Sequence, residues 1–279
     1  MKQLYDDVSF KCSKLVTKNY STSFSMAVYM LAPSIRDAIY SIYGFVRFAD
    51  EIVDSFHGYD KENLISDFEA EYYKAMKSGI SLNPILNSFQ QTVKKYNISD
   101  DMVQSFLKSM KLDLVKSDYQ SKEEYNEYIY GSADVVGLMC LKVFVNGDKT
   151  KYDQLKDEAM RLGSAFQKVN FLRDLKDDNL LLNRNYFPGV DLNSFDENSK
   201  KAIIEEIEED FRIAYNGIVK LPLEAKFGVY TAFVYYKKLL KKLANTPCHE
   251  IGNTRIRVSN YSKAGLLAQS FVSYKLKLV

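Results

Sequence analysis

Two acidic segments carry side chains that could handle a charged substrate. The first is Arg47-Phe-Ala-Asp50-Glu51-Ile-Val-Asp54. At about 100° per residue, the arginine and the three acids fall within roughly 100° of one another on a helix, so they share one face. The flanking residues are mostly apolar or aromatic, where charged side chains are seldom buried unless paired or bound to a metal. The segment predicts a line of carboxylates facing an internal site.

The second acidic segment lies more than a hundred residues further along the chain, and its letters are Gln167-Lys-Val-Asn170-Phe-Leu-Arg173-Asp174-Leu-Lys-Asp177-Asp178. Gln167, Asn170, Asp174 and Asp178 stack along one face within roughly 80°. Oxygen ligands of this kind suit Mg²⁺, which usually binds through one or two carboxylates and substrate phosphates.

Together the two faces indicate a metal-dependent reaction of a diphosphate. Facing each other across a helical cavity, they would hold metal ions that neutralise the charge developing as a carbon–oxygen bond breaks. The 21 Tyr and 17 Phe residues could line the cavity and stabilise a carbocation through cation–π contacts. A single D-x-x-x-D pattern is commonly only a solvated helix face. Two such patterns, each in an apolar segment, favour a functional site.

The elements that must position these residues are predicted to be helices. The chain has only five Pro and twelve Gly in 279 residues, shows 3.6-residue periodicity and lacks strand-like alternation, so we predict an all-α fold with one domain over residues 1–279. Ser121 and Glu124 form a predicted capping box. Helices are expected over 3–17, 35–56, 60–77, 84–96, 102–115, 125–145, 151–180, 196–218, 223–244 and 260–276, with loops at 182–194 and 245–259.

The composition argues against several other classes of protein. A formal charge of +2 gives no basic surplus for nucleic acid. Three cysteines and two histidines poorly supply a disulfide framework, a zinc site or a Ser/His/Asp hydrolase. The N-terminal residues do not resemble a signal peptide, and the longest apolar stretch, 135–145, is short for a membrane span. We therefore expect a reduced, cytoplasmic setting.

Five motifs in order along the chain resemble the squalene/phytoene synthase family of head-to-head trans-isoprenyl diphosphate synthases, most closely the bacterial phytoene synthases. They cover almost the whole chain. The motifs are Tyr20-Ser-Thr-Ser-Phe24, R-x-x-D-E-x-x-D from Arg47, Tyr128-Ile-Tyr-Gly-Ser-Ala-Asp-Val-Val-Gly137, Q-x-x-N-x-x-R-D-x-x-D-D from Gln167, and Arg184-Asn-Tyr-Phe-Pro188.

The resemblance implies an isoprenoid synthase helical bundle around a central apolar cavity and a role for each matching residue. Tyr128, Arg47, Asp50 and Asp174 would be catalytic, with Tyr128 either removing a proton or steering the departing diphosphate. The implied diphosphate-binding residues are Ser21, Ser23, Arg47, Arg184 and Tyr186. The implied Mg²⁺ ligands, with Mn²⁺ as a substitute, are Asp50, Asp54, Asn170, Asp174, Asp178 and Gln167.

Three positions depart from the family pattern. Glu51 stands where a second Asp is common, Asp134 where Gly usually follows Ala, and Lys168 where a more apolar residue is usual. None of these changes removes an implied metal ligand. We expect them to bear on substrate shape, with Asp134 altering helix packing near the cavity or adding a polar group there.

The resemblance implies three possible products. The phytoene branch joins two geranylgeranyl diphosphates through a cyclopropyl intermediate and loses a proton; the squalene branch joins two farnesyl diphosphates and requires NADPH; the dehydrosqualene branch uses farnesyl diphosphate and loses a proton. We favour phytoene, and hence carotenoid biosynthesis, because the chain lacks the C-terminal membrane helix of eukaryotic squalene synthases. The implied partners are allylic prenyl diphosphates, a membrane surface that receives the product, and a downstream desaturase.

Two non-enzymatic functions remain open from the sequence: a helical scaffold and a lipid-binding protein that uses the same apolar cavity. Intact metal ligands argue against both. A di-iron bundle is disfavoured because neither His57 nor His249 lies three residues after a glutamate.

Overall fold

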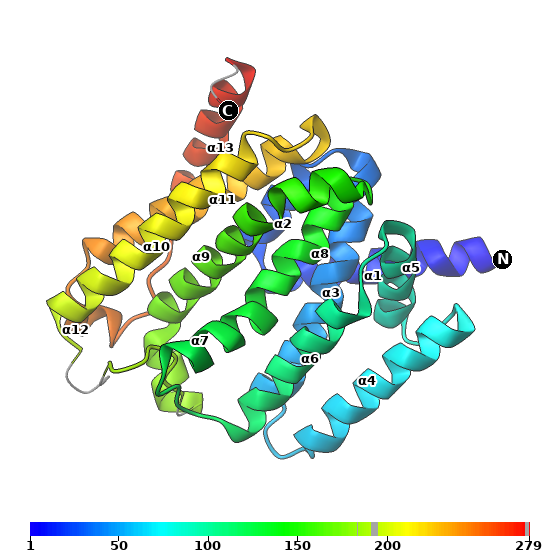
Figure 1. Cartoon of the computed structure of the whole chain (residues 1–279), viewed down its shortest axis with the longest axis horizontal. Coiled ribbons are helices and arrows are strands. Elements are labelled where there is room, and N and C mark those ends of the chain that lie inside the picture. The colour runs from blue at the N-terminus through cyan, green and yellow to red at the C-terminus, as the bar shows by residue number, and fades with distance from the viewer. Residues whose placement is uncertain (183, 191–194, 277–278) are drawn as a thin grey trace.

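The chain folds into an array of helices (Figure 1). The computed structural model describes residues 1–182, 184–190, 195–276 and 279, the side chains of 177–182 and 260 excepted. In this part of the chain the only β-type backbone pairing is an isolated bridge between Asp118 and Asn185. The elements are α1 Lys2–Tyr20, α2 Thr22–Tyr29, α3 Pro33–Ser55, α4 Lys61–Ser78, α5 Pro84–Tyr96, α6 Asp100–Val115, α7 Lys122–Ile129, a π-helical turn Tyr130–Asp134, α8 Val135–Phe144, α9 Lys149–Leu182, α10 Glu197–Ile218, α11 Leu223–Ala244, α12 Cys248–Ile251 and α13 Asn260–Lys275.

Local signals fix where several helices begin and end. Ser121 caps α7, accepting a hydrogen bond from the Glu124 amide at 3.1 Å, which confirms the predicted capping box. Ser21 caps α2 in the same way through the amide of Phe24. Gly79 ends α4 in the left-handed conformation, with φ of 74°, which glycine adopts without steric cost. The all-α fold predicted from the sequence is confirmed.

Helix α3 runs through the main hydrophobic core. Phe45 is fully buried and stacks on Phe89 of α5, with ring centroids 4.0 Å apart. Helices α1, α5, α6 and α8 surround α3, so its apolar faces are all covered. The acidic stripe at the C-terminal end of α3 is therefore carried by one of the most firmly held helices of the molecule.

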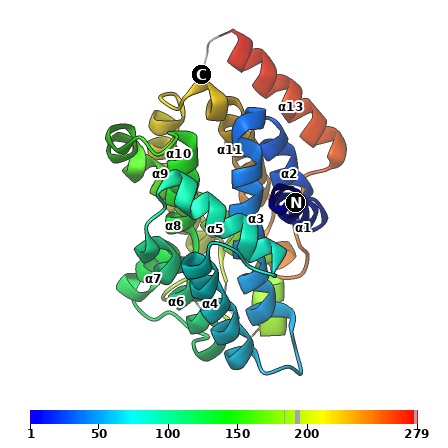
Figure 2. The ribbon, with the colours of Figure 1, turned by 90° about the vertical axis from the view of Figure 1, so that its right-hand side faces the viewer.

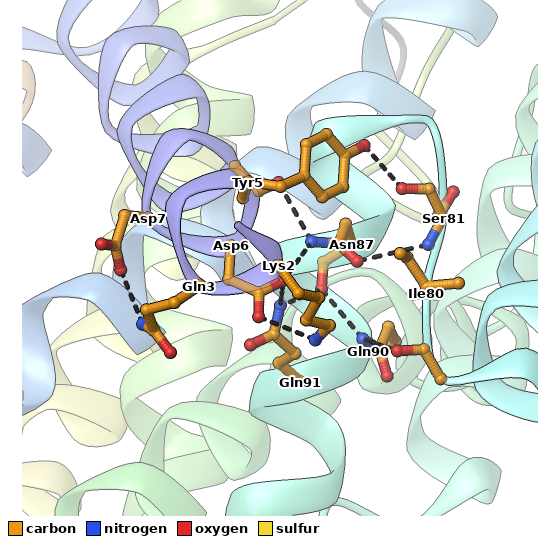
Figure 3. A network of polar contacts seen from close by, with 12 residues as sticks. Lys2, Gln3, Tyr5, Asp6, Asp7, Ile80, Ser81, Asn87, Gln90 and Gln91 are labelled. Atoms are coloured by element: carbon orange, nitrogen blue, oxygen red, sulfur yellow. Dashed lines mark hydrogen bonds and ion pairs between the residues drawn. The ribbon is translucent and has the colours of Figure 1, made fainter.

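Helix α1 is attached to α5 by buried polar contacts rather than by apolar packing (Figure 3). The Asn87 side chain donates to Asp6 Oδ1 and to Ser9 Oγ, both at 3.0 Å. Gln91 donates to the same oxygen of Asp6 at 2.9 Å, and the Tyr5 hydroxyl donates to the carbonyl of Ser81 at 2.6 Å. Because these groups are specific in direction, they fix how α1 lies on the bundle.

Residues 125–145 form α7, a π-helical turn and α8 instead of the single helix predicted. The turn lies where the backbone approaches two other helices. A Cβ atom on Gly131 would lie 2.0 Å from Ser109 Oγ of α6, and one on Gly163 of α9 would lie 2.7 Å from the carbonyl oxygen of Ala133. Such π turns commonly occur at functional sites. This one forms part of a cavity wall, through Ser132 and Ala133.

Candidate active site

The three carboxylates of the acidic stripe of α3 are paired with two arginines from different parts of the chain. Arg47 forms ion pairs with Asp50 and Glu51, which follow it by three and four positions, or about one helical turn. Arg184, which follows α9, donates from Nη1 to Asp54 Oδ1 at 2.7 Å. Burial, followed by the charge of Asp54, raises the pKa of Asp50 to about 7. The stripe is thus a crowded set of carboxylates that a cation would stabilise.

Arg184 joins three elements, and its side chain is only 5% exposed. Besides Asp54 of α3, it contacts the hydroxyl of Tyr186 at 3.2 Å and the carbonyl oxygen of Asp113 in α6 at 2.9 Å. The structure therefore brings three predicted residues together, Asp54, Arg184 and Tyr186, although 130 positions separate the first two.

Asp113 was not predicted as a site residue, yet it lies at the centre of this group. The Tyr128 hydroxyl donates to Asp113 Oδ2 at 2.8 Å. The other oxygen, Oδ1, is buried and has no hydrogen-bond partner among the described residues. Burial raises the pKa of Asp113 to about 7 against the opposing effect of Arg184. The spacing in the sequence could have indicated Asp113. It lies seven residues after Phe106 and three after Met110, on the helix face that these two buried side chains occupy.

Tyr128 is buried in an aromatic cluster beside Asp113. Its ring centroid lies 4.8 Å from that of Tyr119 and 5.3 Å from that of Tyr186, which in turn stacks on Phe171 of α9 at 4.0 Å. Burial, reinforced by the charge of Asp113, raises the pKa of Tyr128 well above its ordinary value. Tyr128 therefore stays a protonated phenol whose O–H donates a hydrogen bond to Asp113 Oδ2.

The second acidic segment occupies the C-terminal half of α9. Asn170 accepts a hydrogen bond from the Tyr236 hydroxyl of α11 at 3.3 Å. Asp174 pairs with Arg173 and also with Arg255, whose Nε lies 2.8 Å from Asp174 Oδ1. Asp178 is on the same helix, but its side chain lies outside the described residues.

Tyr43 and Tyr236 line the same cavity, next to the two acidic segments. Burial raises the pKa of Tyr43 to about 12, and the charged or ionisable groups that act on it include Arg47, Asp50 and Tyr236. Tyr236 bonds to Asn170, so Tyr43 of α3 and Asn170 of α9 face the same cavity. Ser21 caps α2 and lies close enough to Tyr43 to lower its pKa, and Ser23 is half-buried in the first turn of α2.

An elongated apolar cavity of about 280 Å³ starts beside these polar groups. Gln167, Asn170, Tyr43 and Tyr236 line it together with apolar side chains of α2, α3, α8, α9 and α11. Its lining follows α9 from Leu155 to Asn170, which is roughly 22 Å at the helical rise per residue. The site thus combines a charged end, suited to a diphosphate, with a long hydrocarbon-like channel.

The model of the family described as squalene/phytoene synthase matches residues 17–262. The chain belongs to this family. Its curated relatives include the phytoene synthase of Arthrospira platensis, 25% identical over 91% of this chain and 90% of the relative. Another is the 15-cis-phytoene synthase of a Paracoccus species, 24% identical over 94% of this chain and 90% of the relative.

Solved structures show the same fold. A dehydrosqualene synthase superposes with a TM-score of 0.81 at 18% identity, covering 98% of both chains. The squalene synthase HpnC from Alicyclobacillus acidocaldarius superposes with a TM-score of 0.75 at 19% identity, covering 88% of this chain and 97% of the other. The family member described here is therefore a prenyltransferase-type enzyme with the all-α isoprenoid synthase fold. All five motifs fall within the matched range.

Two of the departures from the family pattern form a separate polar cluster behind the cavity. Ser164 donates to Asp134 Oδ1 at 2.6 Å. The buried ammonium of Lys168 bonds to Glu206 at 2.5 Å and to Asp210 at 2.7 Å. These contacts join the π-helical turn, α9 and α10. Asp134 therefore contributes a polar contact between the π-helical turn and α9.

Proposed function

We propose that the enzyme condenses two geranylgeranyl diphosphates head to head, through a cyclopropyl intermediate, to give phytoene for carotenoid biosynthesis. The observation that carries the proposal is the charged group of Arg47, Asp50, Asp54 and Arg184 at one end of a long apolar channel. The names of the curated relatives support the C20 substrate. The favoured setting is the cytoplasm, with delivery of the product to a membrane and a downstream desaturase.

The proposal includes Mg²⁺, or Mn²⁺ in its place, and the chemistry of the donor set fits such an ion. Asp50 and Asp54 share a helix face, and their mutual repulsion adds to the burial that raises the pKa of Asp50. The described residues contain no group of three or more His, Cys, Asp or Glu side chains placed so that they could hold a metal ion. Mg²⁺ commonly takes one or two carboxylates and completes its shell with water and substrate phosphate.

Asp50 and Asp54 would hold the ions from α3, and Gln167, Asn170, Asp174 and Asp178 would hold them from α9. When bound, the metal supplies positive charge to the departing diphosphate. Arg47, Arg184 and Tyr186 would bind diphosphate oxygens, with Ser21 and Ser23 at the start of α2. Because both arginines are paired with carboxylates in the free enzyme, binding would release Asp50 and Asp54 toward the metal.

After ionisation, a carbocation would lie in the channel, away from water. Phe24 stacks on Tyr43 and Phe166 stacks on Tyr236, with centroids 4.8 and 4.0 Å apart, and all four side chains line the cavity. Their ring faces stabilise positive charge without offering a nucleophile. This lining would let the carbocation rearrange and would keep water from capturing it.

The last step of the phytoene branch is the loss of a proton from the substrate cation. We assign it to Tyr128 and Asp113. The phenol oxygen would take the substrate proton while its own proton passes to Asp113 Oδ2, 2.8 Å away. The electrons of the broken C–H bond form the central double bond. A carboxyl group with a pKa near 7 is suited to accept and then release that proton.

Product analysis tests the proposal. Purified enzyme is incubated with Mg²⁺ and either geranylgeranyl or farnesyl diphosphate, each with and without NADPH. We expect a C40 product from geranylgeranyl diphosphate that does not depend on NADPH. A C30 product would instead assign the squalene branch if NADPH is needed, and the dehydrosqualene branch if it is not. Absence of any condensed hydrocarbon and of diphosphate release would overturn the reaction.

A further inference from the structure

The C-terminal helix α13 has an outward face that is nearly as apolar as its packed face. Tyr261, Gly265, Ala268, Val272 and Leu276 are exposed and fall within roughly 80° of one another around the helix. Tyr261 is 93% exposed, Val272 54% and Leu276 64%. An exposed apolar strip of this kind marks an interaction surface.

Helix α13 is held in place by contacts on its opposite side. Phe271 and Tyr274 pack on Phe227 of α11, with ring centroids 6.0 and 5.2 Å away, and Ser270 is buried. Lys263 donates to the Thr22 hydroxyl at 3.1 Å, tying the first turn of α13 to the start of α2. The apolar strip therefore faces outward because of how the helix is packed. Figure 2 shows α13 and α1 along the same side of the molecule.

The sequence around this face has a surplus of basic residues, of which Arg255 is paired with Asp174 and Lys237 with Glu208. Residues 252–279 contain Arg255, Arg257, Lys263, Lys275 and Lys277 and no acidic residue, whereas the whole chain is nearly balanced. The adjacent helix α11 adds four lysines in its C-terminal half, at 237, 238, 241 and 242. A second copy of the chain docking symmetrically would place basic residues against basic residues. An anionic lipid surface is complementary to both the charge and the apolar strip.

We propose that α13 is an interfacial helix that docks the enzyme on a membrane containing anionic lipid, with Tyr261, Val272 and Leu276 in contact with the bilayer. No helix in the described part of the chain is long and apolar enough to span a membrane. Helix α11 lies between the two apolar regions: Gly228, Val229 and Ala232 line the substrate cavity, while Phe227 contacts α13. Docking would bring the cavity within one helix of the bilayer.

The absence of Trp from the sequence allows a site-specific test. The full-length Val272→Trp variant is titrated with vesicles of phosphatidylglycerol and phosphatidylcholine in equal parts, and with vesicles of phosphatidylcholine alone. We expect a blue shift of the indole emission and quenching by brominated lipid with the anionic vesicles, weakened by salt. The matched control is Leu82→Trp, between α4 and α5, where the native residue is 93% exposed; its emission should not shift.

A second pair of variants measures the contribution of the strip. Val272→Glu should weaken binding to the anionic vesicles at least about tenfold, because an apolar contact is replaced by a charge of the same sign as the lipid. Leu82→Glu should leave it unchanged. Binding that is equal for neutral vesicles, or unaffected by Val272→Glu, would overturn the proposal. So would a blue shift that depends on protein concentration without vesicles, since a second copy would then occupy the face.

This inference rests on the membrane delivery named in the proposed function, and it can fail independently of the proposed reaction. With substrate dispersed in detergent, Val272→Glu should turn over prenyl diphosphate at the wild-type rate, because the residue lies outside the cavity lining. Loss of vesicle binding with retained turnover supports the docking role. Loss of turnover in detergent as well would mean that the face serves folding or catalysis and would overturn the assignment.

Discussion

Arg184 shows how one side chain can organise a site assembled from distant segments. It spans Asp54 and the Asp113 carbonyl with two different nitrogens. A lysine would keep the charge but could not make both contacts in the same geometry. We predict that Arg184→Lys lowers kcat/KM by about 10- to 100-fold, as expected for loss of one hydrogen bond to a charged group. Steady-state kinetics should show this loss, whereas Arg212→Lys at an exposed pair should match wild type.

Substitution of Asp113 tests whether Tyr128 and Asp113 together remove the substrate proton. Asp113→Asn preserves the shape and can still accept from Tyr128, but it removes the basic carboxylate. We predict a fall in kcat of about 10²- to 10⁴-fold with KM changed little, because the loss affects proton transfer rather than binding. Since wild-type Asp113 acts only when ionised, its contribution rises with pH through about 7. A variant with unchanged kcat would contradict the role; exposed Asp101→Asn on the same helix is the control.

At the scale of elements, the sequence predicted most helices because their apolar periodicity is strong. It did not predict α2, the short α12 or the break between α7 and α8. The break depends on contacts of Gly131 with α6 and of Gly163 with the turn, which join positions far apart in the sequence. Asp50 and Asp54 were found because their helix spacing is local. Asp113 was missed because no second acid accompanies it, and its significance arises only from Tyr128 and Arg184.

The polar cluster of the π-helical turn, α9 and α10 should give stability a specific pH dependence. Burial raises the pKa of Asp134 from 3.8 to about 6, against the opposing effects of Ser164 and Lys168. The folded protein therefore binds this proton more tightly than the unfolded chain, and the contribution to stability is present below about pH 4 and is lost as the pH rises through about 6. Asp134→Asn removes the ionisation but keeps an acceptor for Ser164.

We accordingly predict that Asp134→Asn gains stability relative to wild type as the pH rises, by on the order of 1–2 kcal/mol between about pH 4.5 and about pH 7.5. Urea unfolding at the two pH values measures this difference. Asp157→Asn, at an exposed position of α9, should show the same difference from wild type at both. A relative loss of stability at the higher pH would mean that Asp134 is held mainly by its attraction to Lys168.

The attachment of α1 gives a prediction that links stability to the site. Asn87→Ala removes two buried hydrogen bonds to α1 and a third that the Asn87 side chain accepts from the Ser81 amide, so we expect unfolding to cost about 2–3 kcal/mol less. Tyr20 at the end of α1 lies under the Arg47 guanidinium, 4.4 Å from the ring centroid, and a loosened α1 should raise KM for the diphosphate. Denaturant unfolding and kinetics test both effects. Exposed Asn126→Ala should change neither.

Substrate length is a property of the whole molecule, because the channel is closed by side chains from helices that only the complete fold brings together. Ala159 lies 11 positions before Asn170, roughly 16 Å along α9 from the charged end, and lines the cavity. A phenylalanine there would fill the distal part of the channel, at a cost of about 1–3 kcal/mol for the longer chain. We predict that Ala159→Phe lowers kcat/KM for geranylgeranyl diphosphate about tenfold or more relative to farnesyl diphosphate, as measured with both substrates in competition. Lys156→Phe adds a ring to the exposed side of the same helix and should leave the ratio unchanged. An equal loss for both substrates would place Ala159 outside the path of the prenyl chain, and the substrate's length would then be set by another wall of the channel.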